Sequence, residues 1–317
     1  MKNDLKLAGA PISWGVCEVP GWGEMLSSDR VLREMSAMGL RATELGPVGY
    51  LGDEPDAIRS LVGSYGLSIV GGFVPLVLHD KEVWVHTEAE VCRIASRYSK
   101  AGAECFVTAV VVDQEWSSPF VLDDQQWDHL VWALAQVDTI CDENGMRQVL
   151  HPHVGTLVET ATDVERMLAT SDVKWCLDTG HLAIGGTDPV AFAATHSDRV
   201  GLVHLKDVRM EFSTAVLDRQ LSLLDATRKG FFCPLGQGDV PVAATVKELL
   251  NRGYDGWFVL EQDMTIDSPA DQARAVDGVA ASLAHLVDEV MAYLPDKVAA
   301  HSASEETPQM GSNNREE

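Results

Sequence analysis

Eight short apolar segments recur along the chain, and each one ends at or directly before a polar residue or a glycine. Strands that are buried on both faces read as continuous runs of Val, Ile and Leu, whereas half-exposed strands alternate apolar and polar residues. The continuous pattern predicts a parallel sheet that is covered by helices. The segments are residues 8–14, 41–46, 67–78, 104–112, 147–153, 173–179, 200–207 and 256–262.

Helical patterns separate these segments. Polar N-terminal signals such as Ser27, Asp123 and Ser268 precede several of them, and glycines such as Gly39 and Gly145 follow others. Eight strand-then-helix units favour a closed (β/α)8 TIM barrel of the α/β class. An open doubly wound sheet is the structural alternative. The predicted helices cover residues 31–38, 127–141, 160–168, 189–195, 242–250 and 269–293.

The length of 317 residues suits one barrel domain. We expect this domain to span residues 1–296. Residues 297–317 lack aliphatic periodicity, and we expect them to form a disordered C-terminal tail.

The formal net charge of -24 constrains the partners. Such a field repels phosphate backbones and anionic lipid surfaces, so we expect neither nucleic acid nor a membrane as partner. The six cysteines form no C-x-x-C pair, and the charged segment 1–7 lacks the apolar core of a signal peptide. A cytoplasmic protein with reduced thiols is expected.

Ionisable residues follow the predicted strands, at the barrel face where active sites form. The last four segments all carry Asp, Glu or His at or near their ends within apolar sequence, and such groups are costly to bury without partners. A divalent cation, Mn, Co, Mg or Zn, would satisfy them. Taken singly, Asp178 could cap a turn and His204 could be a core histidine. The strand-end residues are Glu44, His79, Asp113, His151, His153, Asp178, His181, His204, Lys206, Asp207, Glu261 and Asp263.

The loop after the first segment carries Trp14, Glu18 and Trp22. Two indoles and a carboxylate predict a wall that stacks against a sugar-like ring, and a core plug is the alternative. Arg209, just beyond the seventh segment, is a further candidate for a substrate contact. The Gly-Gln-Gly-Asp segment at residues 236–239 lacks a complete dinucleotide or P-loop motif and is interpreted as a turn.

Seven motifs are spread along the chain: ISWGVCEVPGWG at 12–23, TELGP at 43–47, GGFVP at 71–75, HPHVGT at 151–156, LDTGH at 177–181, HLKD at 204–207 and PLGQGD at 234–239. Together they resemble the xylose isomerase-like barrel superfamily of sugar isomerases, epimerases and dehydratases. Within it, they look like the myo-inosose-2 dehydratase branch. The resemblance spans residues 8–290.

The resemblance implies that Asp178, His204 and Glu261 are metal ligands. The first ligand of the superfamily is usually a Glu at the end of the fifth strand, where this chain has His151-Pro152-His153. Glu159 is our first choice for the missing ligand, and His151 or His153 is the alternative. His151 is also a candidate for contacting substrate.

The chemistry implied is metal-dependent dehydration of a polyhydroxylated cyclic ketone of the inosose type, as in inositol catabolism. A base removes the proton next to the carbonyl, and water then leaves. His181, His153 and Glu44 are candidate bases, and Lys206 is a candidate acid. The alternatives are a ketose isomerase or epimerase that acts through a metal-bound enediolate, and a non-catalytic sugar-binding protein. The partner is a small polyhydroxylated ketone or sugar. Barrels of this kind often form homo-oligomers.

Overall fold

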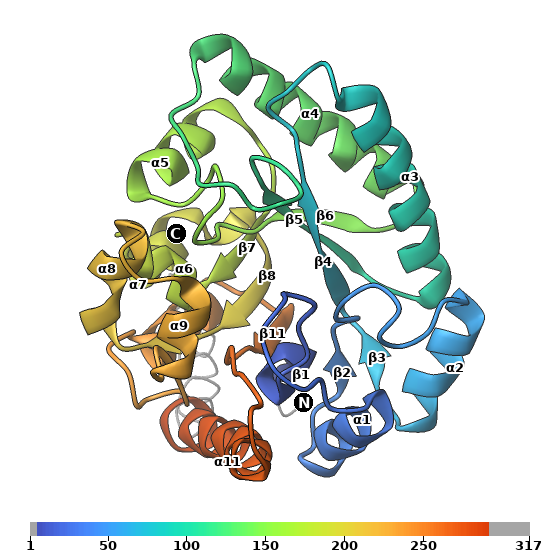
Figure 1. The fold of residues 1–317 in the computed structure, drawn as a ribbon, viewed down its shortest axis with the longest axis vertical. Coiled ribbons are helices and arrows are strands. Elements are labelled where there is room, and N and C mark those ends of the chain that lie inside the picture. The colour runs from blue at the N-terminus through green and yellow to red at the C-terminus, as the bar shows by residue number, and fades with distance from the viewer. Residues whose placement is uncertain (1–4, 292–317) are drawn as a thin grey trace, which may run out of the picture.

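The computed structural model describes residues 5–291, and its centre is a nine-stranded parallel sheet rolled into a barrel (Figure 1). The strands lie in the order β3-β2-β1-β11-β8-β7-β6-β5-β4. A separate antiparallel pair, β9 and β10, lies outside it. The strands are β1 (Lys6–Gly9), β2 (Ala42–Thr43), β3 (Ser68–Ile69), β4 (Gly71–Leu76), β5 (Cys105–Val110), β6 (Arg147–Leu150), β7 (Trp175–Asp178), β8 (Val200–Leu205), β9 (Asp207–Val208), β10 (Phe232–Cys233) and β11 (Trp257–Leu260).

The sheet closes through Val70, the single residue between its two terminal strands. Val70 donates its N–H to the Thr43 carbonyl of β2. Its own carbonyl accepts from Glu104 and from Cys105, the first residue of β5. β3 and β4 therefore occupy one position of the barrel, which leaves the eight positions predicted. Gly71 permits this closure, because a Cβ there would lie 2.5 Å from the Cys105 carbonyl oxygen. The TIM barrel is confirmed, and the open sheet is excluded.

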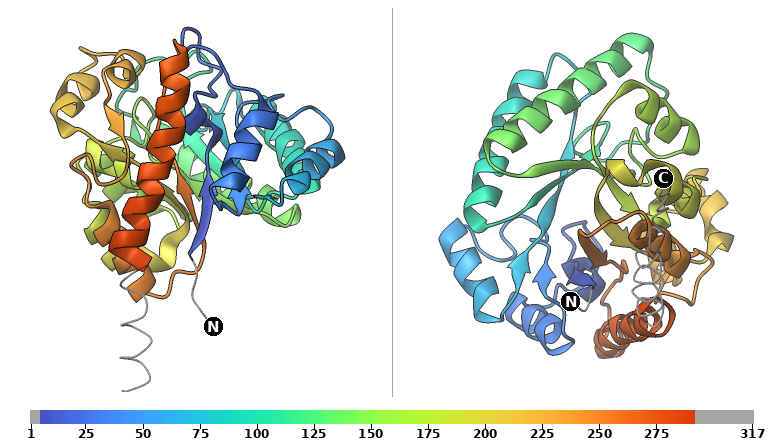
Figure 2. Two further views of the ribbon diagram at one scale, coloured as in Figure 1. Left: turned by 90° about the horizontal axis from the view of Figure 1, so that it is seen from below. Right: turned by 180° about the vertical axis from the view of Figure 1, so that it is seen from behind.

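Helices form the outer wall, with α11 running along the side of the barrel (Figure 2). Capping boxes at Asp123 and Thr160 begin α4 and α5, and the Ser268 side chain caps α11. The helices are α1 (Ser28–Ala37), α2 (Pro55–Ser64), α3 (Trp84–Ala101), α4 (Asp124–Glu143), α5 (Ala161–Thr170), α6 (Thr179–Ile184), α7 (Pro189–His196), α8 (Ser213–Leu217), α9 (Leu223–Arg228), α10 (Val242–Asn251) and α11 (Pro269–Leu286). Short 3-10 turns are η1 (Pro11–Trp14), η2 (Ser197–Arg199) and η3 (Met210–Phe212), and a π-helical turn, η4 (Val287–Met291), follows α11.

The first strand and the last helix end at other residues than predicted. The strand predicted over residues 8–14 ends at Gly9, because Pro11 has no N–H for a ladder and instead opens the 3-10 turn η1. The last predicted helix runs to residue 293. In the structure α11 ends at Leu286, the π-helical turn η4 continues to Met291, and residues 292–293 lie outside the described residues. The predicted domain end at residue 296 and the tail at 297–317 lie outside the described residues. Within residues 5–291, no helix is both long and apolar enough to cross a membrane.

The barrel interior is a layer of small and medium side chains, separate from the larger core between sheet and helices. Strand residues two apart point to the same side. The residues that follow this layer by two positions therefore also point inward, at the carboxyl end of the barrel. The interior layer contains Ala8, Ala10, Ala42, Val70, Cys105, Val107, Val149, Cys176, Leu202 and Val259.

Candidate metal and catalytic site

A second inward-facing layer caps the interior layer, and it is polar. Each of its members follows an interior residue by two positions, so the period of the strand sets its direction. Asp178 and His204 are also paired in register across β7 and β8, which places them side by side. The layer comprises Glu44 after Ala42, His151 after Val149, Asp178 after Cys176, His204 after Leu202 and Glu261 after Val259.

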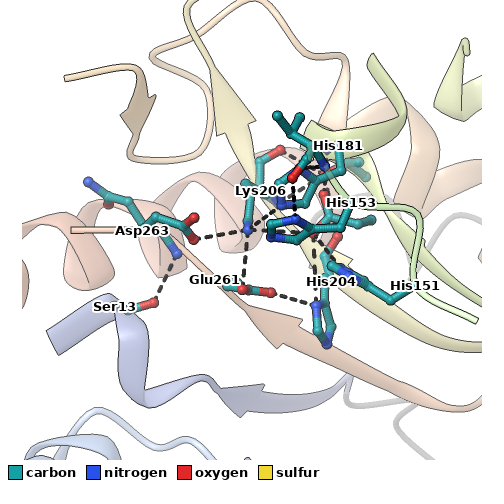
Figure 3. Close-up of polar contacts among 12 residues, drawn as sticks. Ser13, His151, His153, His181, His204, Lys206, Glu261 and Asp263 are labelled. Carbon is teal, nitrogen blue, oxygen red and sulfur yellow. Dashed lines mark hydrogen bonds and ion pairs between the residues drawn. The ribbon is translucent and has the colours of Figure 1, made fainter. Parts of the chain in front are cut away.

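Four of these side chains converge on one point. Figure 3 shows three of them, His151, His204 and Glu261. One donor atom from each of His151, Asp178, His204 and Glu261 lies within 4.8 Å of the others. His151 Nε2 lies 3.2 Å from Asp178 Oδ2, and His204 Nδ1 lies 2.5 Å from Glu261 Oε2. Two nitrogens and two carboxylate oxygens make a donor set that divalent transition metals accept.

Three buried atoms of this group have no hydrogen-bond partner, which is what an intended cation ligand would show. His204 Nδ1 and Glu261 Oε2 are buried, and neither has a partner in hydrogen-bond geometry, although they lie close together. His151 Nδ1 is also buried without a partner. Buried polar atoms in native proteins are normally satisfied, so the convergence of these groups is what a metal-binding site requires.

Glu44 holds the far side of the His204 ring, because its Oε1 lies 3.0 Å from His204 Nε2. Both side chains are buried. Burial works against a charge on His204, but Cys176 and the carboxylates of Glu44 and Glu261 raise its pKa well above the ordinary value. A carboxylate on the second ring nitrogen is the usual way to orient a metal-binding histidine. The sequence made Glu44 a candidate base. In the structure its carboxylate contacts His204.

Lys206 is a fully buried cation beside the four donors. Its Nζ lies 2.9 Å from Asp263 Oδ1, 3.2 Å from Glu261 Oε1 and 3.7 Å from Asp178 Oδ2. Burial opposes its charge, but these carboxylates, Asp263 first, raise the pKa of Lys206 above its usual range. Gly180 makes room for the lysine stem, since a Cβ there would lie 2.7 Å from Lys206 Cγ.

Two further histidines stack beside this lysine, and their ring centroids are 4.0 Å apart. His153 Nδ1 lies 2.7 Å from the Val154 carbonyl oxygen, so this nitrogen carries the proton and Nε2 keeps a free electron pair. Burial, with His151 and Lys206, lowers the pKa of His153 to about 3. Burial also lowers the pKa of His181, whose Nε2 lies 3.1 Å from Lys206 Nζ. Both rings are neutral at physiological pH.

Glu159 lies outside the group of four donors. Its Oε1 accepts the Gly155 N–H at 2.7 Å, and its Oε2 accepts from Arg219 Nη2 at 2.5 Å. Both oxygens therefore have partners other than a cation. The structure brings His151 to the position for which the sequence favoured Glu159.

The indoles predicted to line the substrate pocket are core residues instead. Trp14 is fully buried and donates from Nε1 to Glu34 of α1, and Trp22 donates to the Met264 carbonyl. Glu18 is exposed on the loop between them. Arg209 is half-buried, and its guanidinium donates to the Gly230 carbonyl. None of these four side chains joins the described donor group, and for Trp14 the core-plug interpretation is the better one.

Four residues that contact the site side chains had no role predicted from the sequence. Asp263 pairs with Lys206, and Arg219 pairs with Glu159. Phe73 lies edge-on to His151, and Trp116 lies edge-on to His153. A strand-end position was the only signal for Asp263, and the Gly-Gly-Phe-Val-Pro motif was the only signal for Phe73.

The comparison with protein families decides where this barrel belongs. The model of the xylose isomerase-like TIM barrel family matches residues 32–286. The chain belongs to this family. Among curated members, inosose dehydratase of Geobacillus kaustophilus is 31% identical over 287 residues, which cover 86% of this chain and 92% of the relative.

Solved structures share the barrel fold with this chain at low sequence identity. The IolI protein with a bound zinc atom superimposes with a TM-score of 0.68 at 15% identity, over 91% of this chain and 99% of its own. The probable 3-DHS dehydratase AsbF of Bacillus anthracis has a TM-score of 0.67 at 15% identity, over 89% and 99%. These likenesses support the fold of this family member.

Proposed function

We propose that this protein is a metal-dependent hydro-lyase that dehydrates a polyhydroxylated cyclic ketone of the inosose type. The observation that carries the proposal is the convergence of His151, Asp178, His204 and Glu261 beside a neutral histidine pair and a buried lysine. Inosose dehydratases among the curated relatives support the substrate class.

The four donors would hold a divalent cation, which supplies a Lewis acid that makes the C–H next to a ketone more acidic. Zn, Co and Mn suit the two nitrogens and two carboxylates. Glu44 would keep the His204 ring in its orientation. His151 thus takes the fourth ligand position in place of Glu159.

His153 is our candidate for the base, because its Nε2 has a free electron pair and its ring is neutral. It would accept the proton from the carbon next to the carbonyl. The C–O bond on the following carbon would then break, and the departing hydroxyl would leave as water with one proton from Lys206, whose Nζ contacts His181 Nε2. The product is an unsaturated ketone. Over the reaction His153 gains one proton, Lys206 loses one, and one molecule of water leaves.

Incubation of the purified protein with 2-keto-myo-inositol tests this proposal. We expect an enone-like ultraviolet absorbance to grow in with Mn²⁺. Its growth should stop when a chelator is added and resume when metal is restored. Interconversion of ketoses by NMR without any enone would favour the isomerase or epimerase. Saturable binding of 2-keto-myo-inositol, without turnover in the presence of any divalent metal, would favour a non-catalytic sugar-binding protein.

A further inference from the structure

Cys176 lies directly beneath the proposed metal site. It precedes Asp178 by two positions on β7, so its side chain points into the barrel on the same face, one layer deeper. The thiol is free and fully buried. No role in the proposed dehydration uses it.

This thiol belongs to a second donor group. Donor atoms of His151, Cys176 and His204 all lie within 4.8 Å of one another. The two histidines are shared with the group that contains Asp178 and Glu261, so the two groups form an inner and an outer position around one imidazole pair. Each of these rings has a buried Nδ1 without a hydrogen-bond partner.

The two positions differ in chemical softness. The outer one adds two carboxylate oxygens, which suit hard cations such as Mn²⁺ and Mg²⁺. The inner one adds a sulfur, which, as thiolate, prefers thiophilic cations such as Zn²⁺ and Cd²⁺. Binding there would release the thiol proton to solvent, since the thiolate is the metal ligand.

We propose that Cys176 creates an inner, thiophilic cation position with His151 and His204. The inference rests on the proposed function, because it takes the same histidines as metal ligands. A cation in the inner position is held by sulfur in place of the two carboxylates. Thiophilic cations therefore compete with the cation of the outer position and inhibit turnover, and replacement of Cys176 relieves the inhibition.

Cys105 offers a matched control. It is a second free and buried thiol of the same interior layer, contributed by β5. Among the described residues, it belongs to neither group of candidate metal donors. Cys105→Ser therefore changes a thiol of equal burial without touching the histidine pair.

Titration of the metal-free protein with Co²⁺ tests the inner position spectroscopically. We expect a sulfur-to-cobalt charge-transfer band in the near ultraviolet for the wild type and Cys105→Ser, and only ligand-field bands for Cys176→Ser. Cys176→Ala replaces the serine variant if the buried hydroxyl impairs folding, as judged by circular dichroism.

Cd²⁺ competition supplies the second readout. Loss of even an outer partner of a metal ligand costs roughly 10–100-fold in affinity, so Cys176→Ser should weaken Cd²⁺ binding at least that much. Mn²⁺ binding should fall far less, because Mn²⁺ prefers the carboxylate oxygens of the outer position. Cobalt bound without a sulfur band in the wild type overturns the inner position while the outer site stands. No cobalt binding at all overturns the metal site itself and the inner position with it.

Discussion

Asp178→Asn should lower kcat/KM for dehydration of 2-keto-myo-inositol by about 10³-fold, even at saturating metal. The amide keeps the shape of the carboxylate. Its oxygen can still accept the backbone N–H of His181, which Asp178 Oδ1 accepts at 2.7 Å. It removes the negative charge and one oxygen ligand. Lewis-acid assistance is worth several kcal/mol, and each ~1.4 kcal/mol of barrier is about tenfold in rate.

Asp188→Asn is the matched control for this variant. Asp188 is an exposed N-cap of α7 that accepts the N–H groups of Val190 and Ala191, and asparagine caps a helix equally well. We expect unchanged turnover. Steady-state kinetics over a metal titration measure both variants, and a loss below about tenfold in Asp178→Asn would contradict a ligand role.

Lys206→Met should destabilise the metal-free protein by about 3–5 kcal/mol in the free energy of unfolding. The methionine fills a similar volume but leaves Asp178, Glu261 and Asp263 buried without their shared cation. Turnover should also fall, because the proton donor beside His181 is lost. Added divalent metal should recover part of the stability, since it supplies positive charge next to the same carboxylates.

Lys174→Met isolates the effect of burial. Lys174 is exposed directly before β7, and its Nζ donates to the Asp198 carbonyl oxygen. Surface replacements usually change stability by less than about 0.5 kcal/mol. Urea unfolding with and without chelator compares the two variants. A metal-free Lys206→Met protein as stable as the wild type would show that the lysine does not balance these carboxylates.

The barrel was predictable because burial on both faces imposes a continuous apolar pattern on every strand. The closure at Val70 was not visible, since one predicted segment, residues 67–78, contains both β3 and β4. Three of the four converging donors, Asp178, His204 and Glu261, stood out at strand ends, and the family resemblance implied that they are ligands. The two-residue period of the strands then sets the direction of each side chain.

The fourth donor was harder to choose, because His151 and Glu159 follow the same strand. In the structure Glu159 pairs with Arg219 and not with the donor group. Arg219 lies 60 residues further along the chain, so no local sequence pattern reveals this pair. Trp14 was misassigned for a related reason. The turn that begins at Pro11 directs its indole to Glu34 on α1, and the sequence around the tryptophan does not reveal that contact.

Metal content after mild dialysis tests most directly whether these four residues form one cation site. Elemental analysis should find one divalent ion per chain in the wild type and in Glu159→Gln. It should find far less in Asp178→Asn and His151→Ala, provided that circular dichroism shows all four proteins folded. A wild type that retains no divalent ion, or a Glu159→Gln protein that loses the ion while His151→Ala keeps it, would contradict the site.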